Sequence, residues 1–222
     1  MAAIKDVLNG FDDSSAILKE AKAHLDTLHS MATLKADFFK DEIYKSLESA
    51  GSQESPLDTP IHTVLDSYIA THAYVSDNAD GIVDVIKGAV NDFINGGREN
   101  IVNGIASIAG KAVTILLGSS EGSEDETSGR FIAVNRLGGI YRLDYRVWKR
   151  SVNSESLKSK AEQVTAMAMY KSTPDCSKMT WDDFLVVFGD SLSPDLSDSD
   201  VEAEKAFVKK SFDDLQGAQK VG

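Results

Sequence analysis

The basic side chains of this chain concentrate between residues 130 and 150. Six lysines and arginines occur there against one aspartate, so the stretch carries +5 (six minus one) while the whole chain carries −12. The charged residues are Arg130, Arg136, Arg142, Asp144, Arg146, Lys149 and Arg150. Such segregation is typical of a docking surface for an anionic ligand, an acidic partner or a second protomer. The alternative is internal neutralisation by the preceding carboxylates, which are Glu121, Glu124, Asp125 and Glu126.

Aromatic side chains alternate with these basic residues. Tyrosine and tryptophan rings can stack on a flat ligand, with arginine planes completing the walls of a pocket. Aromatic residues are also ordinary strand formers and core residues. The expected ligand-binding residues are Tyr141, Arg142, Tyr145, Arg146, Trp148 and, from the preceding apolar segment, Ile108. The spacing favours a small aromatic or apolar ligand, and it does not identify a cofactor.

One stretch follows the first half of a calcium-binding loop. Asn78, Asp80 and Asp84 have the required spacing, but the twelfth position is Lys87, where calcium needs a bidentate glutamate. A helix-capping turn is therefore favoured over a metal site.

The sequence contains no recognisable catalytic motif. The four histidines lack the i, i+4 spacing of a helical metal site, and the single cysteine, Cys176, excludes a cysteine zinc site and an intramolecular disulfide. There is no phosphate-binding loop, dinucleotide fingerprint or nucleophile elbow. We therefore expect a non-enzymatic protein. The alternative is an enzyme whose site assembles only in the fold.

The net charge and the composition restrict the partners. A pI near 4.7 disfavours nucleic acid, since phosphate binding requires a surplus of lysine and arginine. The N-terminus lacks the pattern of a secretory signal, and no Asn-x-Ser/Thr acceptor occurs, so a cytoplasmic location is expected. The apolar segment 101–117 is too short and too polar in places to be a convincing membrane span.

Helical periodicity dominates most of the chain. Apolar residues recur every three or four positions, and Thr59-Pro60 is a typical helix start. Helices are expected at about residues 17–47 (one helix or two), 61–72, 82–94, 101–117, 154–167, 181–189 and 200–215. Thr180-Trp-Asp-Asp183 resembles a capping box at the start of helix 181–189. Segment 101–117 is apolar around most of its circumference, which indicates a buried central helix.

From Arg130 the period changes to two, which predicts one β-hairpin over about residues 130–148. Gly138-Gly139 is expected to form a two-residue turn, so that Val134 faces Leu143 and Ile132 faces Tyr145. In this register one face is apolar. It contains Ile132, Val134, Tyr141, Leu143, Tyr145 and Val147.

These elements predict a mainly α fold, a multi-helix bundle with the hairpin inserted after the buried central helix. Residues 1–222 are expected to form a single domain, with a flexible acidic hinge at 118–129 and a disordered tail at 216–222. The expected function is to self-associate as a homodimer through the hairpin and to bind a small aromatic or apolar ligand between helix 101–117 and the hairpin. The alternative is a membrane-active protein whose Gly-rich helices 82–94 and 101–117 rearrange on lipid.

Overall fold

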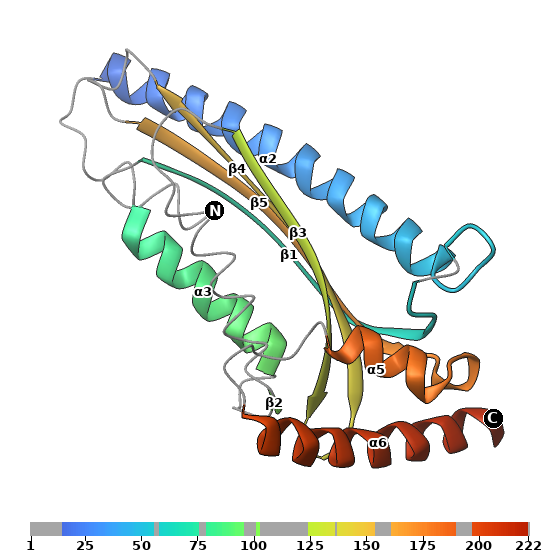
Figure 1. The fold of residues 1–222 in the computed structure, drawn as a ribbon. Helices are drawn as coiled ribbons and strands as arrows, with labels where there is room; N and C mark the ends of the chain where they lie inside the picture. The colour runs from blue at the N-terminus through green and yellow to red at the C-terminus, as the bar shows by residue number, and fades with distance from the viewer. Residues whose placement is uncertain are drawn as a thin grey trace.

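The computed structural model describes residues 15–55, 58–75, 79–95, 101–102, 124–135, 137–153, 161–189 and 197–221 (Figure 1). The helices in these ranges are α2 (Ser15–Ser49), α3 (Ala79–Asn95), a 3-10 helix (Cys176–Lys178), α5 (Trp181–Gly189) and α6 (Asp198–Val221). The strands are β1 (Ile61–Val75), β2 (Ile101–Val102), β3 (Glu124–Asn135), β4 (Ile140–Asn153) and β5 (Ala161–Pro174).

The strands form one antiparallel sheet in the order β1-β5-β4-β3-β2, so the mainly α helical bundle was a wrong prediction. Segment 61–72, which was expected to be helical, lies within β1. Of the expected helix 154–167, residues 161–167 belong to β5 and residues 154–160 lie outside the described ranges. Residues 163–170 of β5 are all buried, which hides the alternation that distinguishes a strand from a helix. The expected helices 17–47, 82–94 and 181–189 correspond to α2, α3 and α5.

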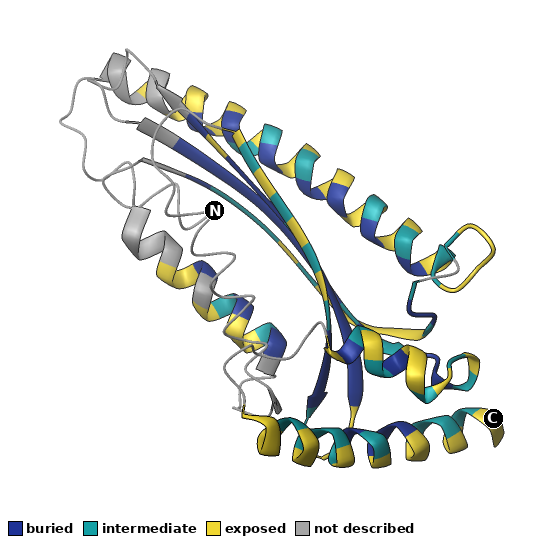
Figure 2. Cartoon of the chain, in the orientation of Figure 1, coloured by how far each residue is buried: buried dark blue, intermediate teal, exposed yellow. Residues whose placement is uncertain are grey.

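Each face of the sheet is covered by a helix. The helix α2 packs on one side, here called the α2 face, against Trp148, Val164 and Tyr170. The helix α3 packs on the other side, the α3 face, where Ile86, Val90 and Ile94 are buried. The strands bend around α3 (Figure 1), and the buried residues of α2 lie on the side of the helix next to the sheet (Figure 2).

The helices α5 and α6 close a third apolar cluster at the hairpin end of the sheet. It consists of Ile132, Val134, Ile140, Cys176, Phe184, Phe188, Val208 and Phe212. The expected capping box at the start of α5 is confirmed, because Thr180 Oγ1 accepts from the Asp183 amide and Asp183 Oδ2 accepts from the Thr180 amide. The helix α6 continues to Val221 and so includes most of the segment expected to be a disordered tail.

The hairpin is present, but its register differs from the prediction by three residues. Val134 lies opposite Ile140 instead of Leu143, and Ile132 lies opposite Arg142 instead of Tyr145. The reason is a longer turn, in which Asn135 Oδ1 accepts hydrogen bonds from the amides of Leu137 (2.9 Å) and Gly139 (3.0 Å). A shift by an odd number of residues changes which side chains share a face.

The corrected register separates the expected apolar face into two. Ile132 and Val134 pack with α5 and α6, whereas Tyr141, Leu143 and Tyr145 face α3. Both faces of the hairpin are therefore covered by helices of the same chain.

Several expectations concern residues outside the described ranges. Of the expected central helix 101–117, only Ile101–Val102 is described, and it forms strand β2. Of the expected hinge, residues 118–123 lie outside, and residues 124–129 belong to β3. Within the part of the chain that the structure covers, no helix is both long and apolar enough to cross a membrane.

Candidate ligand site on the sheet

The residues expected to bind a ligand do not converge on one site. All five that are described lie on β4, where successive side chains point to opposite faces. Tyr141 and Tyr145 face α3, while Trp148 packs against α2. Arg142 and Arg146 share the α2 face with Trp148 because they are an even number of residues away. Ile108 lies outside the described residues.

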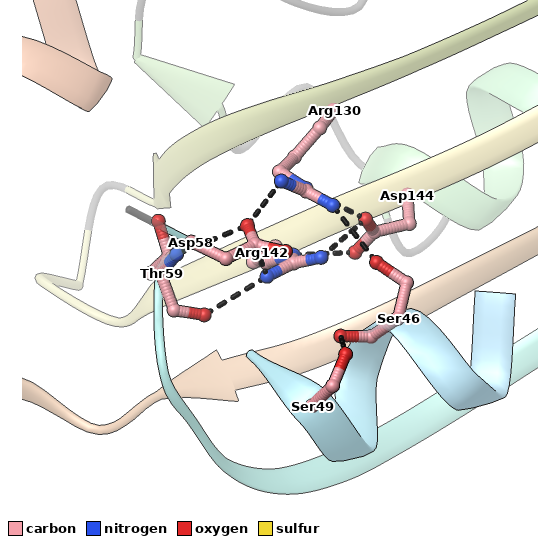
Figure 3. Close-up of polar contacts among 7 residues, drawn as sticks. All are labelled: Ser46, Ser49, Asp58, Thr59, Arg130, Arg142 and Asp144. Atoms are coloured by element: carbon pink, nitrogen blue, oxygen red, sulfur yellow. Dashed lines mark hydrogen bonds and ion pairs between the residues drawn. The ribbon is translucent and has the colours of Figure 1, made fainter. Parts of the chain in front are cut away.

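The arginines on the α2 face are neutralised within the chain (Figure 3). Arg142 is fully buried, and its Nε and Nη2 each donate to Asp144 over 2.7 Å. Its Nη1 donates to the Thr59 carbonyl over 2.9 Å. Arg130 donates to Asp144 over 3.0 Å, and Asp58 pairs with both arginines. Two positive and two negative charges therefore cancel in a network that joins β3, β4, α2 and the start of β1.

Two further arginines of the cluster also have acidic partners. Arg146 Nη1 lies 2.9 Å from Glu42 and 3.1 Å from Glu126, and Arg150 lies 3.7 Å from Glu124. Internal neutralisation by acidic residues of segment 121–126 was one of the two sequence interpretations. Glu124 and Glu126 take part as strand residues, not as a hinge, and Glu121 lies outside the described residues.

A polar pocket of about 220 Å³ opens between β3 and α2. Its charged side chains are Glu42, Arg130, Asp144 and Arg146, and each forms an ion pair with an oppositely charged group. Arg130 uses all three of its guanidinium nitrogens for Asp144, Asp58 and Ser46, and Arg146 uses Nη1 for both of its ion pairs. The two positive and two negative charges of the pocket therefore balance within the chain.

A second polar group lies on the α3 face, as a row across four strands. In the strand register His72 of β1 is opposite Thr165 of β5, Thr165 is opposite Lys149 of β4, and Lys149 is opposite Asp125 of β3. Their chain neighbours Ala73, Val164 and Trp148 pack on the α2 face, so the row faces α3. Three strand spacings of about 4.8 Å give the row a length of about 14 Å.

The centre of the row is buried, its two ends at His72 and Asp125 are half-buried, and the row has unused hydrogen-bonding capacity. Lys149 is 1% and Thr165 2% exposed, and the adjacent pair Ser151 and Gln163 is 7% and 8% exposed. Among the described residues, eight buried side-chain atoms have no hydrogen-bond partner, and four of them belong to these two rows; they are His72 Nε2, Ser151 Oγ, Gln163 Oε1 and Thr165 Oγ1. Each unpaired buried polar atom costs about 1–3 kcal/mol, and native proteins satisfy about nine in ten. Four such atoms on two adjacent rows could be satisfied by a ligand that forms hydrogen bonds.

Burial controls the protonation of the row. It lowers the pKa of Lys149, while the nearby Asp125 acts in the opposite direction. Burial also lowers the pKa of His72, and the electrostatic interaction with His29 lowers that pKa further. At neutral pH the His72 imidazole is therefore uncharged, since its ordinary pKa of 6.5 is already below 7.

An apolar floor continues from the polar row along the same face. The next positions on β4 and β5 are Val147, Met167, Tyr145 and Met169, and Tyr145 stacks on Phe131 with ring centroids 5.4 Å apart. A cavity of about 10 Å³, room for about one water molecule, separates this floor from α3. The side chains of α3 therefore fill the space above the floor, and a ligand must displace part of this helix.

The helix α3 is fastened at its C-terminal end. Lys171 Nζ donates to the Phe93 carbonyl over 2.6 Å, and the Tyr141 hydroxyl donates to the Ile94 carbonyl over 3.4 Å. A cation at a helix C-terminus also interacts favourably with the helix dipole. Burial raises the pKa of Tyr141 to about 12, so its hydroxyl stays a donor at neutral pH. These two bonds hold the C-terminal end of α3 to the sheet.

The described residues define an α+β protein built on one antiparallel sheet, with a polar row and an apolar floor on the α3 face. No protein-family model, no curated protein and no solved structure matches the chain.

Sequence reasoning missed the row because it placed the four residues on separate elements. His72 was assigned to a helix, Thr165 to another helix, and Lys149 to the basic cluster alone. The polar residues Gln163 and Thr165 alternate with Val164 and Ala166, but this alternation is too short to indicate a strand, because the apolar run from Ala166 to Tyr170 follows it directly. Of the weak metal positions, Asp80 and Asp84 lie in α3 and Asn78 is outside the described residues; no metal-binding group occurs in the parts described.

Proposed function

We propose that this protein binds a small amphiphilic molecule on the α3 face. The polar group of the ligand would lie at the row formed by His72, Thr165, Lys149 and Asp125. Its apolar or aromatic part would lie between the floor and α3. The observation that supports this function is the set of unpaired buried polar atoms directly beside a continuous apolar surface. We further propose that binding is non-enzymatic and takes place in the cytoplasm.

The polarity of the α3 face changes along a single strand. On β4, Tyr141, Leu143, Tyr145 and Val147 form the apolar part, whereas the next two positions on this face are Lys149 and Ser151. Small-molecule sites usually combine an apolar lining with a few convergent polar groups that fix orientation. An amphiphile can use both parts of the face in one binding mode. A purely apolar ligand would leave the polar row unsatisfied.

The helix α3 supplies the cover in this proposal. Ile86, Val90 and Ile94 form its buried face, while Asp84 and Asp92 are exposed on the outside. The membrane-active alternative requires α3 to leave the sheet entirely, which exposes both apolar surfaces. Ligand binding requires a smaller displacement and replaces the lost contacts with ligand contacts. The geometry therefore favours ligand binding over insertion into a membrane.

The test uses the fluorescent apolar probe N-phenylnaphthylamine. We expect the probe to bind the wild-type protein saturably. In Met169→Trp we expect the affinity for the probe to fall at least tenfold, about 1.4 kcal/mol, because the larger ring fills the space between the floor and α3. Val186→Trp adds the same ring at an exposed position of α5 and should bind the probe normally. Circular dichroism shows whether each variant is folded. Absence of saturable binding to the wild type, or normal binding by folded Met169→Trp, contradicts the proposal.

We also propose that the protein self-associates, through β1 and not through the hairpin. The hairpin faces are covered by helices, whereas β1 pairs with β5 on one side only among the described strands. β1 exposes Val64, Leu65 and Ile69. It contains one aspartate and no lysine or arginine, so two copies of this edge would repel each other little despite the net charge of −12. Antiparallel pairing of two β1 edges gives a closed, two-fold symmetric dimer.

A further inference from the structure

We infer that the two copies of β1 pair in one particular register, with Ile69 on the two-fold axis and Asp66 of each copy opposite His72 of the other. This inference rests on the proposed self-association through β1 and names the residues by which one copy recognises the next. The axis is perpendicular to the sheet, so facing residues lie on the same face of the joined sheet.

The backbone of β1 restricts the part of the strand that can pair. β1 is irregular up to Asp66, because its register with β5 shifts twice before this residue. From Asp66 to Val75, successive residues of β1 face successive residues of β5. A regular strand offers an evenly spaced edge, whereas an irregular one disrupts the ladder. An axis at Ile69 keeps the paired segment 66–72 within the regular part, whereas an axis at Ser67 would include irregular residues.

The exposed side chain of Ile69 determines the position of the axis on the α2 face. Ile69 lies on this face with Ala73, four positions further, and it is 42% exposed. On the axis it meets Ile69 of the second copy, so the two apolar side chains bury each other. Moving the axis by one residue would place Ile69 opposite Ser67 or Thr71. With the axis at Ile69 these two residues instead face each other, so that apolar groups meet apolar ones and hydroxyls meet hydroxyls.

The same register brings complementary polar groups together on the α3 face. Asp66 is exposed and His72 is half-buried, so part of each side chain is open to a second copy. Within its own chain Asp66 accepts from the Ser67 amide over 2.8 Å and acts on Lys171 as an opposite charge, while His72 interacts with His29. A carboxylate has about four acceptor sites, and a neutral imidazole carries one N–H donor. The Asp66 carboxylate can therefore accept a further hydrogen bond from His72 of the second copy.

The inferred register also connects the dimer to the candidate ligand site. The polar row ends at His72, which lies on the strand where the second copy binds. Asp66 of the second copy would lie beside this end of the row. Each copy therefore contributes a carboxylate to the site of the other.

The closing experiment is disulfide cross-linking of the full chain under mild oxidation. Facing residues of an antiparallel pair have Cα atoms about 4.5–5.5 Å apart, which is within the range of a disulfide. We expect Ile69→Cys to form a covalent dimer on a non-reducing gel, because the two thiols face each other across the axis. The wild type should give none, since its Cys176 is buried.

Ser67→Cys and Thr71→Cys are the matched controls. Each lies four residues along the strand from its own copy, roughly 13 Å, so neither should form a dimer alone, whereas a mixture of the two should form the mixed dimer. If Ser67→Cys or Thr71→Cys alone links as well as Ile69→Cys, the register is overturned and association through β1 stands. If no variant and no mixture links, both the register and association through β1 fail.

A double-mutant cycle tests the polar pair. We expect Asp66→Ala and His72→Ala each to raise the dissociation constant of the dimer at least fivefold, and the double variant to raise it no further than either single variant. His62→Ala removes another histidine of β1, exposed and outside the paired segment, and should leave the dimer unaltered. Circular dichroism shows whether each variant is folded. Effects that multiply in a folded double variant show that the two residues do not meet, and they overturn the inference.

Discussion

Arg142 lies fully buried where the start of β1, the strands β3 and β4, and the end of α2 meet (Figure 3). Its guanidinium makes a two-pronged contact with Asp144 and donates to the Thr59 carbonyl. Paired arginine–carboxylate contacts of this geometry are among the stronger side-chain interactions. The arginine therefore joins elements that are distant in the sequence, which is a structural role and not a ligand-binding one.

We predict that Arg142→Ala lowers the free energy of unfolding by about 3–5 kcal/mol, because it leaves Asp144 and Asp58 buried without one of their cations. The matched control is Arg150→Ala, in which the arginine is 45% exposed and its partner Glu124 is 3.7 Å away, so the loss should be below about 1 kcal/mol. Urea denaturation followed by circular dichroism measures both. Equal losses in the two variants would show that the buried network does not stabilise the fold.

The pairing of β3 with β4 depends on a glycine beneath an aromatic ring. Gly129 is the cross-strand partner of Tyr145, and a Cβ at this glycine would collide with the tyrosine ring. That ring is also stacked on Phe131 and buried under α3, so it has little room to move. The close approach explains why this position of an otherwise β-forming segment is a glycine.

We predict that Gly129→Ala destabilises the protein by about 1–3 kcal/mol through overpacking. Gly88→Ala is the matched control, since Gly88 is an exposed residue of α3 and a Cβ there would meet nothing within 4 Å. It should stabilise the helix by about 0.5–1 kcal/mol. Thermal unfolding should show a lower melting temperature for Gly129→Ala and a higher melting temperature for Gly88→Ala than for the wild type. A neutral or stabilising Gly129→Ala would contradict the arrangement of Tyr145 over the strand.

At the scale of the whole molecule, the open edge of β1 is the surface on which self-association depends. A long edge strand with exposed apolar side chains readily pairs with another strand, and proteins commonly prevent this with a lysine at the edge. β1 carries no lysine, and its outer edge pairs with nothing in the ranges described.

We predict a concentration-dependent dimer in sedimentation velocity, which Ile69→Lys converts to a monomer by placing two like charges across the new strand pair. Val186→Lys adds the same charge at an exposed position of α5 and should leave the dimer intact. A wild-type protein that stays monomeric at every concentration refutes the proposed dimer. So does a dimer that Ile69→Lys does not weaken.

The amphipathic helices and the local turn chemistry could be read from the chain alone. The spacing of apolar residues located α2, α3 and α5, and the Thr180–Asp183 capping box is confirmed by its reciprocal hydrogen bonds. These features depend on residues three or four positions apart, which interact within one element. The presence of a hairpin near residue 138 was likewise a local property.

Only the tertiary structure decided the sheet and the candidate site. The strand β5 is buried on both faces, so its apolar pattern did not reveal its period, and the hairpin register depended on the longer turn at Asn135. The row on the α3 face joins His72, Lys149 and Thr165, which are brought together by cross-strand pairing and not by spacing along the chain. Pairing energies between distant strands are not encoded in any short segment, and that is the physical reason why this site could not be predicted from the sequence.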